Sequence, residues 1–176
     1  TTGTGNTAVG MRSQRVGTTG DNNTSIGKDT LYTNTTGEFN TALGNNALEG
    51  NTTADNNTSV GYNSMKANTT GTVNVAVGAE TLQANTTANH NAAFGYRALK
   101  ANTTGTLNVA LGSNALVLNT TGGNNAAIGY ASLGANTTGS TNSALGVASL
   151  STNTTGASNV AVGYQSLKLA TTASNN

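Results

Sequence analysis

The sequence has no cysteine and very few charged side chains, and both absences narrow what the protein can be. Without cysteine it has no disulfide framework and no thiolate metal site. Charged residues are 7% of the chain, against about 25% in a typical soluble domain. The net charge is +1 and there is no basic run, so nucleic acid is not an expected partner. No apolar run approaches membrane length, so membrane insertion is not expected either.

The chain consists mainly of Thr, Asn, Gly, Ala and Ser, and these residues follow a strict repeat of 17 residues. A disordered, weakly charged linker has no reason to keep such a period. The period indicates stacked, near-identical coils, so we predict one solenoid over residues 1–176. The chain starts in register with the repeat, and we expect it to be a processed protein or a part of a longer one. The ten coils and the final partial repeat are 1–17, 18–34, 35–51, 52–68, 69–85, 86–102, 103–119, 120–136, 137–153, 154–170 and 171–176.

Several positions of the repeat, numbered from its first Thr, hardly vary. Positions 1 and 2 are Thr, position 6 is Asn and position 10 is Gly in every copy. Position 8 is always Ala or Ser, and position 9 is always large and apolar. Position 14 is Leu in eight of the ten coils, and position 17 is Asn in eight. These positions are expected to carry the fold, while positions 4, 11, 12 and 15 vary freely.

The pattern within each copy predicts an all-β fold with at least one strand per coil. Positions 5–9 alternate with a period of two, as in 73–77, so positions 5, 7 and 9 share one face of a strand and 6, 8 and 10 share the other. Positions 11–16 fit either one helical turn or a second short strand, and Leu at position 14 is expected in the core. Successive strands would pair in parallel about 4.8 Å apart, giving a rod roughly 48 Å long.

The Asn columns are expected to form hydrogen-bonded ladders of stacked side-chain amides. Asn-Thr-Thr occurs eight times and is formally an N-glycosylation acceptor, but stacked coils would crowd the glycans, so a ladder is again the preferred interpretation. Thr glycosylation is a separate alternative that stays open. The predicted ladder at position 6 comprises Asn6, Asn23, Asn40, Asn57, Asn74, Asn91, Asn108, Asn125, Asn142 and Asn159.

The predicted core is thin, because only positions 9 and 14 supply dependable large apolar side chains. The constant small residue at position 8 has two explanations: crowding inside the coil, or the close approach of a neighbouring chain. We predict a homo-oligomer in which the face formed by positions 6, 8 and 10 packs against partner subunits.

The segment 159–166, Asn-Val-Ala-Val-Gly-Tyr-Gln-Ser, resembles the head repeats of trimeric autotransporter adhesins. The longer pattern Asn-Thr-Thr-Gly-x-x-Asn-x-Ala-x-Gly-x-x-Ala-Leu also looks like repeats of bacteriophage tail fibres and large bacterial surface proteins. The resemblance covers the whole chain. It implies a left-handed parallel β-roll, three chains side by side, and the stiff stalk or head of an extracellular fibre. The period of 17 exceeds the adhesin-head unit, so another symmetry is the alternative.

Candidate chemical sites are sparse, and no catalytic residue, cofactor or metal is expected. The only histidine, His90, stands at a variable position and is interpreted as a packing side chain. Asp21, Glu38 and Asp55 share position 4 of successive coils; a bound cation is the alternative to a solvated acidic stripe. Exposed tyrosines at position 11 of every second coil could stack on sugars. They are Tyr62, Tyr96, Tyr130 and Tyr164.

These observations predict a non-enzymatic structural segment of an extracellular fibre, on a cell surface or a virion, that displays a binding tip. The expected partners are identical chains, with a trimer favoured. The alternative is a surface-binding solenoid that adheres to cell-surface glycans, or less favourably to ice, through the repeated Thr and Asn columns or the tyrosines. Adjacent Thr side chains in an extended segment point in opposite directions, which argues against a flat ice-binding array.

Overall fold

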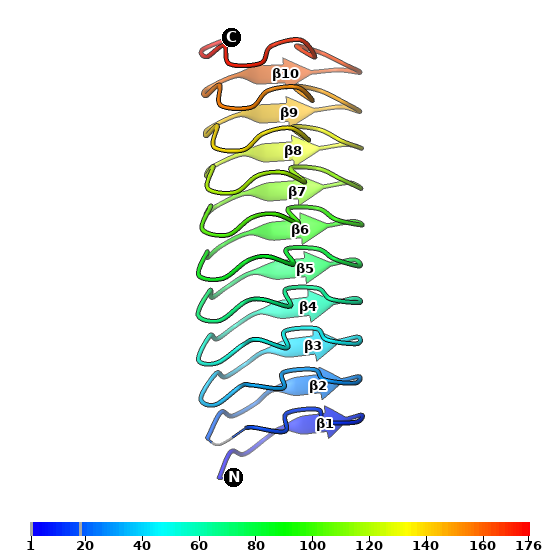
Figure 1. Cartoon of the computed structure of the whole chain (residues 1–176), viewed down its shortest axis with the longest axis vertical. Coiled ribbons are helices and arrows are strands. Elements are labelled where there is room, and N and C mark those ends of the chain that lie inside the picture. The colour runs from blue at the N-terminus through cyan, green and yellow to red at the C-terminus, as the bar shows by residue number, and fades with distance from the viewer. Residues whose placement is uncertain (1, 18) are drawn as a thin grey trace.

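The computed structural model describes residues 2–17 and 19–176, and each repeat forms one coil of a rod (Figure 1). Every coil contributes one strand of three residues, at repeat positions 7–9. The ten strands form a single sheet in sequence order. They are β1 (Thr7–Val9), β2 (Thr24–Ile26), β3 (Thr41–Leu43), β4 (Thr58–Val60), β5 (Val75–Val77), β6 (Ala92–Phe94), β7 (Val109–Leu111), β8 (Ala126–Ile128), β9 (Ser143–Leu145) and β10 (Val160–Val162).

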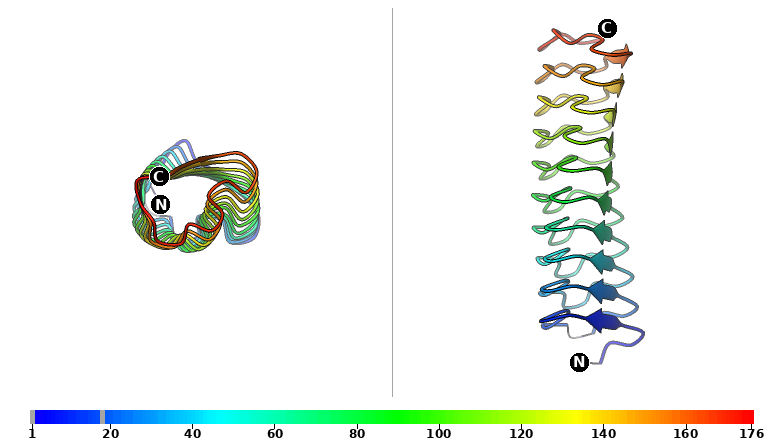
Figure 2. Two further views of the ribbon diagram at one scale, coloured as in Figure 1. Left: turned by 90° about the horizontal axis from the view of Figure 1, so that it is seen from above. Right: turned by 90° about the vertical axis from the view of Figure 1, so that its right-hand side faces the viewer.

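All neighbouring strands are parallel and pair residues that are 17 apart in the sequence, as Val75 pairs with Ala92. Equal repeat positions therefore stack into continuous columns along the rod, which twists gradually about its long axis (Figure 2). This confirms the predicted all-β, parallel solenoid of 17-residue coils. The strands are shorter than predicted, because position 5 has a positive φ, for example +57° at Val73, and the extended conformation begins only after it.

Positions 11–16 form neither of the two structures that the sequence suggested. The residues at positions 12 and 14 have positive φ angles, such as +57° at Glu80 and +49° at Leu82, and no helix occurs in the described chain. A helix or a strand needs a run of residues with negative φ. Because residues with positive φ alternate with others, positions 11–16 instead fold into consecutive tight turns. The backbone groups of these turns bond to the neighbouring coils: Glu80 N donates to Tyr62 O and Leu82 N to Ala98 O.

Each coil encloses a single interior, which Figure 2 shows end-on. The side chains at position 14 fill it, as predicted, and the small residues at positions 8 and 13 complete it. A Leu in the left-handed region costs roughly 1–2 kcal/mol, which burial of its side chain offsets. The position-14 side chains that are fully buried are Leu31, Leu48, Met65, Leu82, Leu99, Leu116, Leu133 and Leu150.

The two faces of the strands are the reverse of the prediction. Ala76 and the rest of the position-8 column from Ser25 onward point into the coil and are buried, whereas the large apolar residues at position 9 point outward. The reason is space: Leu at position 14 and two asparagines already occupy the interior, and only a methyl or hydroxymethyl group fits opposite them. The face of positions 6, 8 and 10 therefore cannot pack against partner subunits. A substitution such as Ala76→Leu would overpack the coil rather than disturb an interface.

Candidate functional site

The asparagines at position 6 form a continuous hydrogen-bonded column inside the rod. Asn91 is typical: its Nδ2 donates to Gly105 O at 3.0 Å, and its Oδ1 accepts from the backbone N–H of Asn108 at 3.0 Å and from Asn108 Nδ2 at 3.2 Å. Asn91 is 1% exposed. Each amide thus satisfies its own polar groups and the backbone of the next coil, which a buried polar group requires.

The asparagines at position 17 form a second buried column. Asn51 Nδ2 donates to Asn34 Oδ1 at 2.8 Å and to Ala54 O at 3.0 Å. The same carbonyl also accepts from Asn40 of the other column. Because these amide nitrogens are buried and, from Asn51 onward, already donate two bonds, the folded coil does not offer the Asn-Thr-Thr sequences for N-glycosylation.

The paired threonines have different roles. At position 1 the hydroxyl donates to the position-1 carbonyl of the next coil, as Thr69 Oγ1 does to Thr86 O at 3.0 Å. Thr70 and the other described residues at position 2 are exposed and form a single column. The side-by-side Thr columns typical of ice-binding faces are therefore not formed by this pair.

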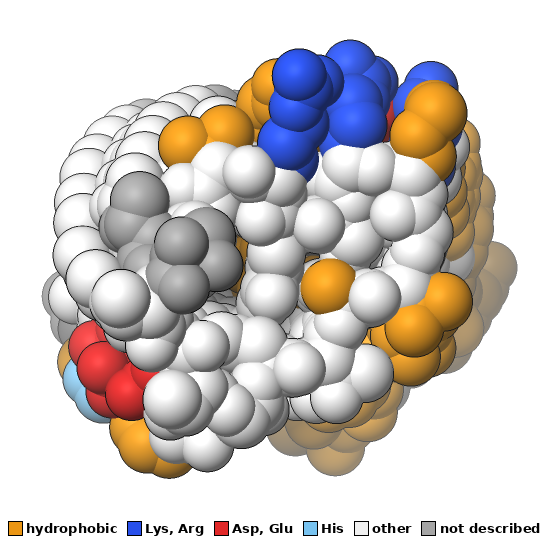
Figure 3. Space-filling view, turned by 90° about the horizontal axis from the view of Figure 1, so that it is seen from below, with side chains coloured by type: hydrophobic (Ala, Val, Ile, Leu, Met, Phe, Trp, Pro, Cys, Tyr) orange, Lys and Arg blue, Asp and Glu red, His pale blue; other side chains and the backbone are white. Residues whose placement is uncertain are grey.

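The outward side of the sheet is an exposed apolar surface that runs the length of the rod. We call the side chains at positions 7 and 9 the sheet face. Position 9 is apolar in all ten coils, and position 7 is Thr in β1 to β4 and mostly Val or Ala from β5 onward. No charged residue occurs at either position. Figure 3 shows hydrophobic side chains gathered along one side of the rod. The position-9 residues are Val9, Ile26, Leu43, Val60, Val77, Phe94, Leu111, Ile128, Leu145 and Val162.

The tyrosines at position 11 lie just beyond the sheet face, after the bend at the position-10 glycine. Their exposed fractions run from 45% at Tyr96 to 74% at Tyr164. The guanidinium of Arg97 lies over the Tyr96 ring, 4.7 Å from its centre. Gln165 Nε2 donates to Tyr164 Oη at 3.0 Å.

The two aspartates at position 4 accept hydrogen bonds from the backbone of the preceding coil. Asp21 Oδ1 accepts from Thr4 N at 2.6 Å, and Asp55 Oδ1 accepts from Glu38 N at 2.7 Å. The uncharged Asn89 does the same for the preceding coil. Within residues 2–17 and 19–176, no three His, Asp or Glu side chains are grouped so that they could hold a metal ion. His90 is exposed and belongs to no such group.

One cluster of charges links two coils. Glu80 Oε2 accepts from Lys100 Nζ at 2.7 Å and from Arg97 Nε at 2.8 Å. These two hydrogen bonds, the one from Lys100 first, lower the pKa of Glu80, and the bond to Glu80 raises the pKa of Arg97.

The Glu80 cluster predicts a small pH dependence of stability. A carboxyl whose pKa is lowered in the folded state stabilises the fold above its unfolded pKa, and this contribution is lost as the pH falls through the folded pKa. We therefore expect Glu80→Gln to lower the melting temperature slightly at neutral pH, with the difference from the wild type vanishing in acid. Glu38→Gln, at a partly exposed position without an ion pair in the described chain, is the control. An equal difference at both pH values would contradict this role for Glu80.

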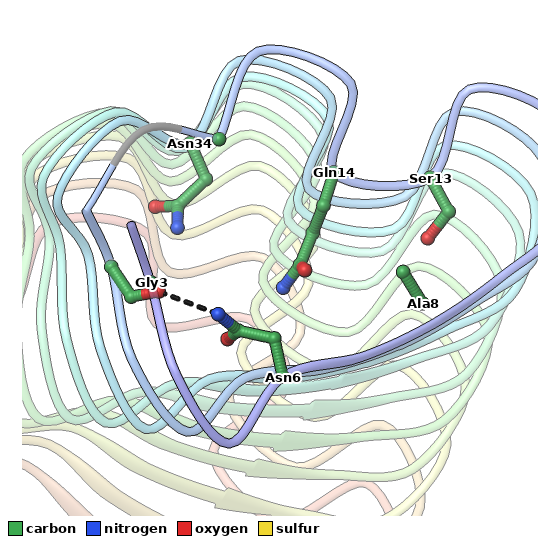
Figure 4. Close-up of a pocket in the computed structure, with 8 residues that line it drawn as sticks. Gly3, Asn6, Ala8, Ser13, Gln14 and Asn34 are labelled. Carbon is green, nitrogen blue, oxygen red and sulfur yellow. Dashed lines mark hydrogen bonds between the residues drawn. The ribbon is translucent and has the colours of Figure 1, made fainter. Parts of the chain in front are cut away.

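The interior opens into a cavity of about 200 Å³ in the first coil, shown in Figure 4. Gln14 stands there in place of the usual Leu, and Gly17 in place of Asn. Gln14 Nε2 is buried and has no hydrogen-bond partner among the described residues. The remaining lining, including Asn6, Ser13 and Asn34, is polar but carries no titratable group.

No protein-family model matches this sequence, and comparison with curated proteins and with solved structures found no significant match. The part of the chain that the structure describes contains no helix able to span a membrane.

Proposed function

We propose that the chain is a non-enzymatic structural segment of an extracellular fibre, in which identical chains lie side by side and cover one another's sheet face. One observation carries this proposal. Position 9 is as strictly apolar as the buried position 14, yet it faces outward. Positions 11 and 15, which are exposed or partly exposed in every coil, instead vary freely from coil to coil.

A second copy of this chain is the partner that best fits the sheet face. Its columns repeat at the same spacing of about 4.8 Å, so the side chains of two parallel rods remain in step along their whole length. The face carries no charge that would repel an identical face. The three-residue strands at positions 7 to 9 cover about 10 Å by 48 Å, or roughly 480 Å² per chain. A standard specific interface buries roughly 800 Å² per partner, so the sheet face amounts to a little more than half of one.

The mechanical role follows from the same architecture. Backbone ladders and the position-6 Asn column bond the coils to one another along the rod, and the position-17 Asn column adds to them in the eight middle coils; the repeat contains no insertion that would act as a flexible loop. A continuous ladder of this kind resists bending and proteolysis. The extracellular location and the assembly of three chains are supported by the resemblance to adhesin heads and tail fibres. A mass of two chains would instead indicate two sheet faces packed against each other.

The substitution Leu111→Lys tests the proposal. Leu111 lies at position 9 and is 48% exposed, so the variant should fold but introduce a charge into the chain–chain contact. We expect the native mass, measured by sedimentation, to fall from that of an oligomer to that of one chain. Leu118→Lys is the matched control: Leu118 lies in the same coil, is 52% exposed and is outside the sheet face. A monomeric wild type, or an oligomer that survives Leu111→Lys, would contradict the proposal.

A further inference from the structure

The row of tyrosines at position 11 has a spacing of its own. Tyr62, Tyr96, Tyr130 and Tyr164 occur in alternate coils, so their rings follow one another about 9.6 Å apart along the rod. The coils between them carry the smaller residues Ala79, Ser113 and Val147 at the same position. Exposed aromatic rings therefore alternate with smaller side chains along the rod. This two-coil period does not occur at position 9, where every coil has a large residue.

Polar side chains with planar groups stand beside this row. Position 12, the next residue along the chain, is Glu80, Arg97 and Asn114 in the three coils from β5 to β7. The Glu80 carboxylate and the Arg97 guanidinium are bonded to each other, and Arg97 also holds the Tyr96 ring. Contacts of this kind fix the direction of the side chains before any ligand arrives, which lowers the entropic cost of binding.

An aromatic row next to planar hydrogen-bonding groups suits one class of ligand in particular. The C–H face of a pyranose ring stacks on an aromatic ring, and its equatorial hydroxyls bond to carboxylates, amides and guanidinium groups. In an extended β-1,4-linked polysaccharide the same face of the sugar turns toward one side at every second ring. The length of that two-sugar repeat is comparable to the two-coil spacing of the tyrosines. The helical α-1,4-linked polysaccharides have no such straight repeat.

We propose that the tyrosine row binds a β-1,4-linked polysaccharide that lies along the rod, with every second sugar stacked on a tyrosine. The row lies beyond the bend that ends each strand, and the same repeat position carries Lys28 and Asn45 in the second and third coils, unlike the uncharged sheet face. When chains assemble through the sheet face, the tyrosine row therefore lies at the edge of the contact between them. The site does not rest on the proposed fibre function, since a single rod presents all four rings.

The test is binding of the native protein to microcrystalline cellulose and to chitin, with amylose as the α-1,4-linked comparison. We expect binding to at least one of the two β-1,4-linked polymers and not to amylose. Tyr96→Ala combined with Tyr130→Ala should weaken it on the order of tenfold for each ring removed, as for other ligands that stack on aromatic side chains. Tyr32→Ala, which removes the one tyrosine outside the row, should leave binding unchanged.

Three results would overturn the proposal: no binding to either β-1,4-linked polymer, equal binding to amylose, or unchanged binding after removal of the row. Native mass is measured on the same variants. If the double tyrosine variant dissociates an oligomer, the row belongs to the contact between chains and the polysaccharide site is wrong. A wild type that is monomeric but binds through the tyrosines would reject the fibre assembly and retain this site.

Discussion

Asn91→Asp is expected to lower the free energy of unfolding by about 3–5 kcal/mol at neutral pH, the range seen when a buried charge is left without a partner. Asparagine and aspartate have the same shape, so the variant creates no cavity. It replaces the Nδ2 group, which donates to Gly105 O and to Asn74 Oδ1, by an oxygen that faces both acceptors. Two donated bonds thus become two repulsive contacts at a site that is 1% exposed.

The effect should depend on pH in a defined direction. Burial raises the pKa of an aspartate in the folded state. The destabilisation is therefore complete above this raised pKa and shrinks as the pH falls through it, because the protonated carboxyl can donate one hydrogen bond again. Urea unfolding of wild type and variant at pH 7 and at pH 4 measures both quantities.

A matched control separates the ladder from the change of charge alone. Asn124 is exposed at position 5, two coils further along the chain, and Asn124→Asp adds the same charge in water. We expect it to change stability by less than about 0.5 kcal/mol. If the two variants are equally stable, the Asn column does not have the structural importance that its hydrogen bonds indicate.

Gly95→Ala is expected to cost about 2–5 kcal/mol, from two separate causes. The residue has a φ of +125°, a conformation that residues with a Cβ rarely adopt. The added Cβ would also lie 2.8 Å from Gly112 C and 2.9 Å from Gly112 O in the next coil. These atoms belong to the backbone and cannot move aside without displacing the coil, so strain of about 1–2 kcal/mol is joined by overpacking of about 1–3 kcal/mol.

The chain itself offers the control for this prediction. Gly163 has a similar φ of +119°, but an added Cβ there meets no described atom within 4 Å. Gly163→Ala should therefore show only the conformational cost, and the difference between the two variants measures how closely the coils approach. Denaturant midpoints of both variants provide this difference. Equal losses would mean that the glycine column is needed for its φ angle alone.

The importance of this glycine column was visible in the sequence, although its reason was not. Ten glycines at a constant interval already indicated a position that accepts no side chain. The sequence alone does not distinguish a turn from the close approach of another backbone as the reason for the glycine. The stacked coils show that both reasons apply. The Asn columns are similar: their recurrence predicted ladders, but not that the amides of positions 6 and 17 share the carbonyl of position 3.

The segment at positions 11–16 of the repeat is where the local sequence preference predicts the wrong structure. The segment 79–84 has the composition of a helix, yet Glu80 and Leu82 both have positive φ angles. Intrinsic preferences of this kind amount to less than about 1 kcal/mol per residue. Complete burial of the Leu82 side chain within the coil contributes about 1.5–3 kcal/mol to the stability of the fold. This burial is possible only if the chain at positions 11–16 turns sharply. For Leu82 this gain exceeds its own helical preference and offsets the cost of roughly 1–2 kcal/mol of its left-handed backbone.

The 17-residue period alone was enough to specify parallel coils, their register and a body without internal boundaries, because identical units stack best when equal positions meet. The alternation within each strand established that its two faces differ. It could not indicate which face lies inside, since that depends on the volume enclosed by one coil. With Leu and two asparagines already in this space, only Ala or Ser fits at position 8, and the large residues at position 9 are directed outward. The apolar sheet face, and with it the candidate interface, exists for this steric reason.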